Sequence, residues 1–424
     1  MDFDITTLAT GCRYSTDCAA TGLNNNQIVV GGSGSGKTMS ITEPCLLHTY
    51  HRNLMVTVTK PRIIGKYAPL LESRGYRVMT LDFANPEKSQ MGFDPMCFLR
   101  SDQDIVNLAQ SIVCADPHKQ QHTSVDPYWD QASVSLLSAL IAGVLVRTPG
   151  AGFGSVLQLF RKLKLIAGDT VTTNLDQFFE VLMDCGRADF ARSNWKNFSG
   201  LPQRTASCVL STLGVTLGSL FGSEVMQLMR NPRKLDLREF AREKTVLFVV
   251  SSPVNPGLNA LVSLFYATAI KELFEFAESF PDGKLPIPVH ILCDDFATGA
   301  PIPQFDQYIS IIREKELSVT VLCQSESQLE HMYGKAGATT VINNCDSYVY
   351  TGSMDLETAR RVGQRLNLPV DAVLGMELGT FAVFRRGAMP VVARRYPILE
   401  DPMYGQLTEN CQKGVVDYDL VRTF

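Results

Sequence analysis

The sequence lacks a long hydrophobic run and a basic amino-terminal segment, and both absences narrow where the protein acts. The longest nearly apolar stretch, Val134–Val146, contains Ser135 and Ser138, whereas a bilayer-spanning helix needs about 20 apolar residues. The first thirty residues carry Asp2 and Asp4 and three consecutive asparagines, not a basic region followed by an apolar one. We therefore expect no transmembrane helix and no export signal, and a cytoplasmic protein that meets a membrane only through another protein.

Cysteine pairs with metal-binding spacing are also missing. The eleven cysteines include no CxxC, and without an export signal we expect them to stay reduced. Cys114, His118 and His122 form the only local cluster of metal-ligating residue types. A tetrahedral site needs a fourth ligand, which the local sequence does not supply. We therefore expect no metal ion at this cluster.

The sequence has no basic excess either. The formal net charge is −4, which counts against a protein coated in nucleic acid but leaves room for a narrow basic channel. The chain is 45% hydrophobic and 19% charged, as in an ordinary globular protein. Its 424 residues suffice for one large α/β domain and an inserted second one.

Short apolar, β-branched runs alternate with helical patterns, which is typical of βαβ units around a parallel sheet. We predict buried strands at residues 27–30, 54–59, 76–82, 245–251, 289–293, 318–323 and 347–351. Between 126 and 235 the strand pattern disappears, so we predict an inserted all-α domain there. It divides the α/β domain into a first part, 1–125, and a second part, 236–424. Beyond Thr380, two short apolar runs about a glycine predict a hairpin at the sheet edge.

A phosphate-binding loop follows the first predicted buried strand. Its sequence matches GxxxxGK[ST] at every fixed position and consists of Gly31, Gly32, Ser33, Gly34, Ser35, Gly36, Lys37 and Thr38. The glycines let backbone N–H groups turn around a β-phosphate at a helix amino terminus. Lys37 would reach the β- and γ-phosphates, and the Thr38 hydroxyl would ligate Mg²⁺. The motif predicts a P-loop NTPase that binds ATP with Mg²⁺.

A second acidic motif completes the expected metal site. The apolar run 289–293 ends in Asp294 and Asp295. We expect Asp294 to hold Mg²⁺ and Asp295 to orient or deprotonate the attacking water. Asp82, which ends another predicted strand without a following carboxylate, is the weaker alternative.

Two downstream residues have types that serve phosphate chemistry. An arginine such as Arg313 can stabilise γ-phosphate charge in a neighbouring subunit. Gln324 directly follows a predicted strand, where an amide can sense the γ-phosphate. Taken alone, Arg313 is more often an exposed ion-pair residue, and Gln324 alone is uninformative.

The order and spacing of these motifs resemble the type IV coupling proteins of bacterial conjugation, the TraG/TraD-like ATPases that pump DNA into a secretion channel. The resemblance covers nearly the whole chain. Beyond the phosphate loop, it is carried by Glu43-Pro44, Gly92-Phe93-Asp94-Pro95, Asp126-Pro127-Tyr128-Trp129, Asp294 to Ala297, Ile302-Pro303, Arg313, Gln324 to Leu329, Tyr333-Gly334 and Asn343-Asn344.

The resemblance implies a RecA-like nucleotide-binding domain broken by an all-α domain, in a homo-hexameric ring at the inner face of the cell membrane. It implies single-stranded DNA, bound without sequence preference, as cargo, with a relaxase or relaxosome and the channel proteins as partners. Arg313, 18 residues after Asp295, falls where the family carries its arginine finger. Gln324 falls where the family carries its γ-phosphate-sensing glutamine.

Three features depart from the family pattern. Asp295 stands where the family has Glu, and such a displacement of a carboxylate can slow hydrolysis. Residues 59–62 read Thr-Lys-Pro-Arg in place of an acidic-Pro-Lys-Gly pattern. The family's amino-terminal membrane helices are missing, which suggests a soluble form or docking through a separate membrane subunit.

The main functional hypothesis is an ATP-driven DNA translocase that couples cargo to a conjugative secretion channel. One alternative is an ATP-switched receptor for effector proteins with little hydrolysis, which Asp295 would explain. Another is a double-stranded DNA pump of the FtsK/HerA type, against which the placement of the helical insertion argues. Two basic clusters are weak DNA-contact candidates: Lys60, Arg62 and Lys66, and Arg161, Lys162 and Lys164.

Overall fold

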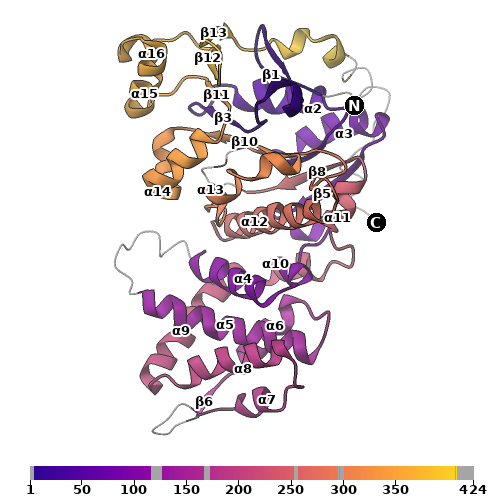
Figure 1. Cartoon of the computed structure of the whole chain (residues 1–424), viewed down its shortest axis with the longest axis vertical. Helices are drawn as coiled ribbons and strands as arrows, with labels where there is room; N and C mark the ends of the chain where they lie inside the picture. Colours follow the sequence, from indigo (N-terminus) through magenta and orange to yellow (C-terminus); the bar gives the residue numbers. More distant parts are fainter. Residues whose placement is uncertain are drawn as a thin grey trace. The chain divides into compact units, whose positions relative to one another are not determined.

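The computed structural model of the chain describes residues 4–115, 127–166, 172–252, 256–294, 296, 300–405 and 407. Two compact units make up the chain (Figure 1). The first unit, which contains the large sheet, comprises residues 1–80, 236–253 and 269–424. The second unit, which is mainly helical, comprises residues 81–235 and 254–268.

The large sheet has nine strands in the order β13-β12-β11-β3-β10-β9-β4-β8-β5. Seven of them confirm the predicted buried strands to within a residue at either end: β3 (Gln27–Val30), β4 (Asn53–Val58), β5 (Arg77–Asp82), β8 (Thr245–Val250), β9 (Val289–Cys293), β10 (Leu317–Cys323) and β11 (Ser347–Tyr350). Strands β11, β3, β10, β9, β4 and β8 run parallel to one another. Every residue of β3, β4, β8, β9 and β11 is buried, as expected for a parallel sheet covered on both faces.

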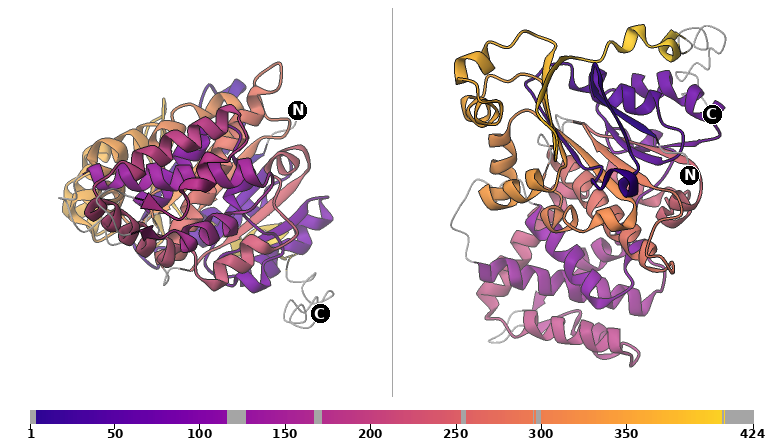
Figure 2. Two further views of the ribbon diagram at one scale, coloured as in Figure 1. Left: turned by 90° about the horizontal axis from the view of Figure 1, so that it is seen from below. Right: turned by 45° about the horizontal axis from the view of Figure 1, so that its top comes forward.

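The carboxyl-terminal hairpin lies at the edge of this sheet, as predicted. It consists of β12 (Thr380–Arg385) and β13 (Val391–Arg394), and β12 pairs antiparallel with β11. A second hairpin, β1 (Ile5–Ala9) with β2 (Cys12–Ser15), was not predicted, because its strands are short and bear polar residues. The backbone N–H of Thr10 donates to the carbonyl of Arg394 at 2.9 Å, so this hairpin lies beside the last strand (Figure 2).

The remaining elements of the first unit are helices and short turns that connect the strands. They are α1 (Cys18–Thr21), the π-helical turn η1 (Thr38–Thr42), α2 (Glu43–Leu47), α3 (Arg62–Ser73), α11 (Leu237–Arg242), α13 (Phe305–Tyr308), η6 (Ile312–Lys315), α14 (Glu326–Asn343), α15 (Leu356–Leu366), α16 (Val370–Leu374) and η7 (Ile398–Glu400). Helix α12 (Pro256–Glu278) contributes residues to both units.

A buried glutamate ties the amino terminus of α14 to α15. Glu326 is 1% exposed and accepts hydrogen bonds from Arg361 at 2.9 Å and Arg365 at 3.1 Å. The Tyr348 hydroxyl on β11 donates to the same carboxylate at 2.8 Å. Because its charge is neutralised and its oxygens are hydrogen-bonded, this carboxylate can stay buried.

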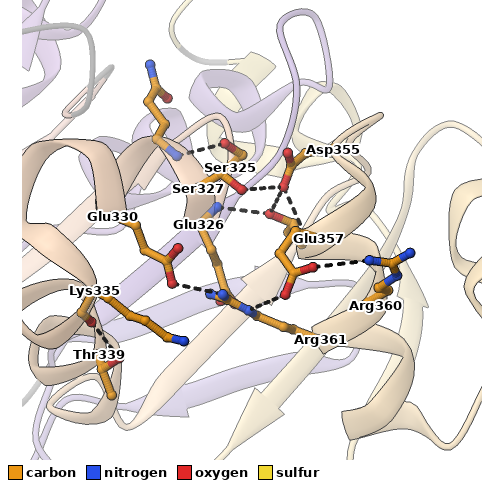
Figure 3. Close-up of polar contacts among 12 residues, drawn as sticks. Ser325, Glu326, Ser327, Glu330, Lys335, Thr339, Asp355, Glu357, Arg360 and Arg361 are labelled. Atoms are coloured by element: carbon orange, nitrogen blue, oxygen red, sulfur yellow. Dashed lines mark hydrogen bonds and ion pairs between the residues drawn. The ribbon is translucent and has the colours of Figure 1, made fainter.

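Neighbouring contacts extend the same junction (Figure 3). Asp355, which caps α15, accepts a hydrogen bond from Ser327 at 3.0 Å. Arg361 also pairs with Glu330 at 2.8 Å and with Glu357 at 3.4 Å. The hydrogen bond to Glu326 raises the pKa of Arg361. Since α14 begins two residues after Gln324, this cluster holds the chain at the carboxyl end of β10.

A buried histidine links β9 to β10 inside the sheet. The two ring nitrogens of His290 lie 2.8 Å from Ser318 Oγ and 2.9 Å from Thr320 Oγ1. Burial, with a smaller contribution from the nearby charge of Arg52, lowers the pKa of His290 well below its ordinary value. The folded protein therefore holds this imidazole neutral.

The second unit is built around α5 (Pro127–Arg147), whose most extensive helix contacts are with α4 (Asp102–Cys114), α6 (Phe153–Lys162), α8 (Gly186–Ser199) and α9 (Gln203–Leu220). It also contains η2 (Pro86–Lys88), η3 (Pro95–Phe98), α7 (Asp176–Glu180), α10 (Ser223–Arg230) and two two-residue strands, β6 (Leu165–Ile166) and β7 (Thr172–Thr173). The predicted boundary at 126 lies outside the described residues. The division into 1–125, 126–235 and 236–424 stays a prediction.

The Gly92-Phe93-Asp94-Pro95 motif has a structural role within the second unit. Asp94 is buried and accepts hydrogen bonds from the backbone N–H groups of Met96 at 3.0 Å and Phe153 at 3.1 Å. It thereby caps η3 and the start of α6. Phe93 packs edge to face against Phe265, with ring centroids 5.3 Å apart.

One described helix, Tyr128–Arg147 within α5, is long and apolar enough to cross a membrane, with a mean hydropathy of 1.5. The bent pair α9 and α10 passes the same test only if it is counted as one span. The sequence expectation of no such helix considered only the unbroken apolar run. The indication is weak, because 61% of the α5 window is buried inside the fold and core helices pass the same test.

We predict that Glu326→Ala lowers the free energy of unfolding by roughly 3 kcal/mol, because two guanidinium groups and a tyrosine hydroxyl lose a buried partner. Glu357→Ala is the matched control: its carboxylate also pairs with Arg361 but is 48% exposed, so its loss should cost at most about 0.5 kcal/mol. Urea unfolding of both variants measures the difference. Equal midpoints would contradict a structural role for the buried carboxylate.

Acid should destabilise the protein through His290. Because its folded pKa is lowered, the unfolded chain takes up a proton below about pH 6.5 that the folded chain does not. This site should therefore remove about 1.4 kcal/mol of stability per pH unit as pH falls below that value. Unfolding midpoints at pH 7.5, 6.5 and 5.5 should decline less steeply for His290→Gln than for the wild type. Parallel declines would show that His290 does not titrate on unfolding.

Candidate functional site

The phosphate loop lies between β3 and η1, at the carboxyl end of β3. Gly31 has no room for a side chain, because an added Cβ would lie 1.8 Å from Thr351 Oγ1. Gly34 and Gly36 have φ angles of 76° and 86°, which residues with side chains rarely adopt. Ser35 Oγ and Thr351 Oγ1, 2.8 Å apart, join the loop to the chain that follows β11.

Lys37 folds back across this loop. Its ammonium group donates to the carbonyl of Gly31 at 2.5 Å and to the carbonyl of Gly32 at 3.0 Å. The residue is buried, with 8% of its surface exposed. A buried cation that faces the inside of a glycine-rich loop is suited to bind a phosphate oxygen.

Thr38 meets Asp294, although the two residues are 256 positions apart in the chain. The Thr38 hydroxyl donates to Asp294 Oδ2 at 2.6 Å. The contact follows from the strand order, because β3, β10 and β9 are parallel neighbours and their carboxyl ends meet at one edge of the sheet. A hydroxyl and a carboxylate at this distance are oxygen ligands of the type that Mg²⁺ prefers.

A cavity of about 510 Å³ opens over the loop. Its lining comprises Ser33, Gly34, Ser35, Gly36, Lys37, Thr38, Met39, Glu43, Thr59, Lys60, Arg62, Ile63, Lys66, Asp294 and Gln324. Lys37, Lys60, Arg62 and Lys66 oppose two carboxylates among these described residues. The surplus of cations suits a polyanionic ligand.

The first predicted basic cluster therefore belongs to this cavity. Lys60 and Arg62 are exposed at its rim. Lys66 is bound by Glu43, and it also donates to the Tyr404 hydroxyl at 2.7 Å. Glu43 in turn accepts from the Tyr67 hydroxyl at 2.7 Å. The second cluster, Arg161, Lys162 and Lys164, lies at and just after the end of α6 in the other unit.

Gln324 and Arg313 lie at opposite ends of β10. Gln324 follows the carboxyl end of the strand and lines the cavity. Arg313 is exposed in η6, just before the amino end, and donates to the carbonyl of Gly22 at 2.8 Å. The seven residues of β10 span roughly 20 Å at about 3.3 Å per residue. Arg313 is therefore not brought to the phosphate loop of its own chain.

Two buried thiols precede the acidic and amide residues of the site. Burial raises the pKa of Cys293 and of Cys323 to about 12. Both thiols therefore stay protonated and contribute packing beneath Asp294 and Gln324, not nucleophilic chemistry.

Some predicted residues lie outside the described part of the chain. Asp295 is one, and His118 and His122 of the possible metal cluster are two more. Asp82, the alternative acid, ends β5 at the far edge of the sheet from β3.

Glu43, Thr351 and Arg395 are polar residues at the site that are absent from the predicted set. Glu43 had a signal, because Glu43-Pro44 is one of the motifs that carry the family resemblance. Thr351 and Arg395 had none, since each reaches the loop only through the pairing of distant strands. Arg395 Nη1 lies 3.7 Å from the position that a Cβ would take at Gly36.

Comparison with solved structures identifies the fold. The structure is similar to the unbound form of the bacterial conjugative coupling protein TrwBdeltaN70, with a TM-score of 0.67, 16% identity, and coverage of 92% of this chain and 88% of that one. It is similar to the plasmid coupling protein TrwB in complex with ADP and Mg²⁺, with a TM-score of 0.65, 16% identity, and coverage of 88% and 85%. VirB4 of Thermoanaerobacter pseudethanolicus aligns with a TM-score of 0.55, 13% identity, and coverage of 96% and 99%. These similarities confirm the predicted RecA-like α/β fold.

Sequence comparison identifies the family. No curated protein matches the chain. The profile of the family described as Type IV secretory system Conjugative DNA transfer matches residues 5–366, which is most of the chain. The resemblance predicted from the motifs is therefore confirmed, and the chain belongs to the type IV secretory system conjugative DNA transfer family.

Proposed function

We propose that this chain is the ATP-driven DNA translocase of a conjugative type IV secretion system and couples a DNA–relaxase cargo to the secretion channel. Family membership supports the role in DNA transfer. The observation that carries the ATPase assignment is the 2.6 Å contact between Thr38 and Asp294. It joins the phosphate loop to the acidic strand end where a nucleotide-bound metal would lie.

The residues present fit ATP with Mg²⁺. Related folds with ADP and Mg²⁺ or with the ATP analogue ADPNP bound support the same ligands here. Thr38 and Asp294 would hold the metal ion, which when bound neutralises charge on the phosphates. Lys37 would exchange the carbonyls of Gly31 and Gly32 for the β- and γ-phosphate oxygens.

Hydrolysis needs two further groups. Asp295, the residue after Asp294, would orient or deprotonate the attacking water. Gln324 would hydrogen-bond to the γ-phosphate, since it lines the cavity at the carboxyl end of β10, the strand between β3 and β9. The shorter side chain of Asp295, compared with the family's Glu, favours slow turnover.

We assign Arg313 to the site of a neighbouring copy. Its position at the amino end of β10, about one strand length from its own phosphate loop, supports a role in trans. A guanidinium group that reaches the next subunit would stabilise γ-phosphate charge during hydrolysis. Such a head-to-tail contact closes into a ring, as in the homo-hexamer that the family resemblance implies.

The remaining partners follow from this assignment. Loops that face the ring channel would bind the phosphates of single-stranded DNA without reading sequence. The ring would work in the cytoplasm at the inner face of the membrane, in contact with the relaxosome and the channel proteins.

Steady-state ATPase assays of the full chain test the motor. Turnover should rise several-fold with single-stranded DNA, and Lys37→Ala should abolish it because the loop loses its phosphate-binding cation. Matched double-stranded DNA is the comparison for the FtsK/HerA alternative. Tight ATP binding with negligible turnover under every condition would contradict the motor and favour the ATP-switched receptor.

Arg313→Ala should keep nucleotide binding but reduce turnover by about a thousandfold, the lower end of the range for arginine fingers. Mixing Arg313→Ala subunits with Lys37→Ala subunits should restore part of the activity, because some interfaces then combine an intact loop with an intact finger. Activity is measured across mixing ratios. Full activity of Arg313→Ala alone would show that the trans role is wrong.

A further inference from the structure

Four arginines lie in or next to the carboxyl-terminal hairpin, and three of them have partners within the first unit. The guanidinium of Arg385 lies 4.1 Å from the centre of the Tyr14 ring, Arg386 pairs with Asp346 at 2.9 Å, and Arg394 pairs with Glu377 at 2.5 Å. Arg395 is exposed, and among the described residues its guanidinium makes no hydrogen bond or ion pair. Of these four arginines, Arg395 is the one whose side chain has neither an ion pair nor a ring contact among the described residues.

The strand pairing carries Arg395 to the edge of the sheet that bears the phosphate loop. Strand β11 is parallel to β3, with Tyr350 opposite Val30, whereas β12 is antiparallel to β11 and β13 antiparallel to β12. Strand β13 therefore runs in the same direction as β3. Its last residue, Arg394, pairs with Thr380 at the carboxyl edge, and Arg395 follows directly.

The backbone of Arg395 is held on both sides. Its N–H donates to the carbonyl of Gly379 at 2.7 Å, and its own carbonyl accepts from the Thr10 hydroxyl at 3.0 Å. The amino-terminal and carboxyl-terminal hairpins together thus fix the point from which the side chain extends.

The Arg395 side chain lies beside two glycines. A Cβ at Gly379 would lie 3.6 Å from Arg395 Cδ and 3.7 Å from Nε, and a Cβ at Gly36 would lie 3.7 Å from Nη1. Both glycines have positive φ angles, 84° and 86°. The guanidinium therefore passes over Gly379 and ends against the phosphate loop itself, one residue before Lys37.

We propose that Arg395 is a nucleotide-binding residue that donates to the α-phosphate of the nucleotide in its own chain. The proposal rests on the proposed function of the phosphate loop. Lys37 is directed to the β- and γ-phosphates, and Asp294 approaches from the β10–β9 side of β3. Arg395 approaches from the β11–β13 side, next to Gly36. It would therefore add a cation on the side of the loop to which neither Lys37 nor Asp294 is directed.

Binding measurements on the full chain with fluorescent analogues of ADP and ATP test this assignment. Arg395→Ala should weaken both by about tenfold, the loss expected for one charge-assisted hydrogen bond. Arg395→Lys should recover part of the affinity because it keeps the charge. Arg394→Ala is the matched control: it removes the neighbouring arginine and its ion pair with Glu377 and should leave nucleotide affinity unchanged.

Each result bears on a different part of the proposal. Unchanged affinity in Arg395→Ala, with binding lost in Lys37→Ala, would overturn the role of Arg395 and leave the proposed ATPase standing. Equal losses of nucleotide affinity in Arg394→Ala and Arg395→Ala would also overturn the role of Arg395, because they would indicate that both substitutions disturb the hairpin. A third outcome is that Arg395→Ala loses affinity for adenine nucleotides but not for guanine nucleotides, and that Arg395→Lys does not restore it. That outcome would overturn the phosphate contact, because it would show that Arg395 stacks on the base. Normal binding by Lys37→Ala would instead contradict the phosphate loop assignment itself.

Discussion

The hydrogen bond between Thr38 and Asp294 is the contact on which the candidate site depends. It exists because β3 and β9 are both parallel to the strand between them, β10, so that their carboxyl ends lie at one edge of the sheet. The hydroxyl and the carboxylate come from segments 256 residues apart. If either strand were reversed, the phosphate loop would remain but would have no acidic partner for a metal ion.

The same sheet places the residues near a chain's own phosphate loop at one edge and Arg313 at the opposite edge. Residues at the carboxyl edge, Lys37, Asp294, Gln324 and Arg395, surround one loop. Arg313 lies at the amino edge, roughly 20 Å away along β10. A rigid parallel sheet that is buried on both faces cannot bend to join the two edges. Cooperation between copies is therefore a consequence of the fold if Arg313 acts in hydrolysis.

Charge at the site is arranged in two ways. Exposed cations at the rim, Lys60 and Arg62, attract a polyanion in a chain whose net charge is −4. Deeper charges are paired: Glu43 with Lys66, and Glu326 with Arg361 and Arg365. The Glu326 cluster holds α14 where it leaves β10, so the position of Gln324 depends on an ion-pair network that contains no phosphate-binding residue.

The sequence by itself determined the phosphate loop, the buried strands and the acidic strand end, because each of these features is formed by residues that are consecutive in the chain. Glycine spacing dictates loop conformation, and runs of apolar β-branched residues dictate strands covered on both faces. Motif order was enough to identify the family. Only the tertiary structure decided that Thr351 and Arg395 reach the loop, that Glu326 is buried between two arginines, and that Arg313 lies at the other edge. These facts depend on strand order and direction, which local periodicity does not encode, because pairing partners are chosen by the packing of the whole sheet.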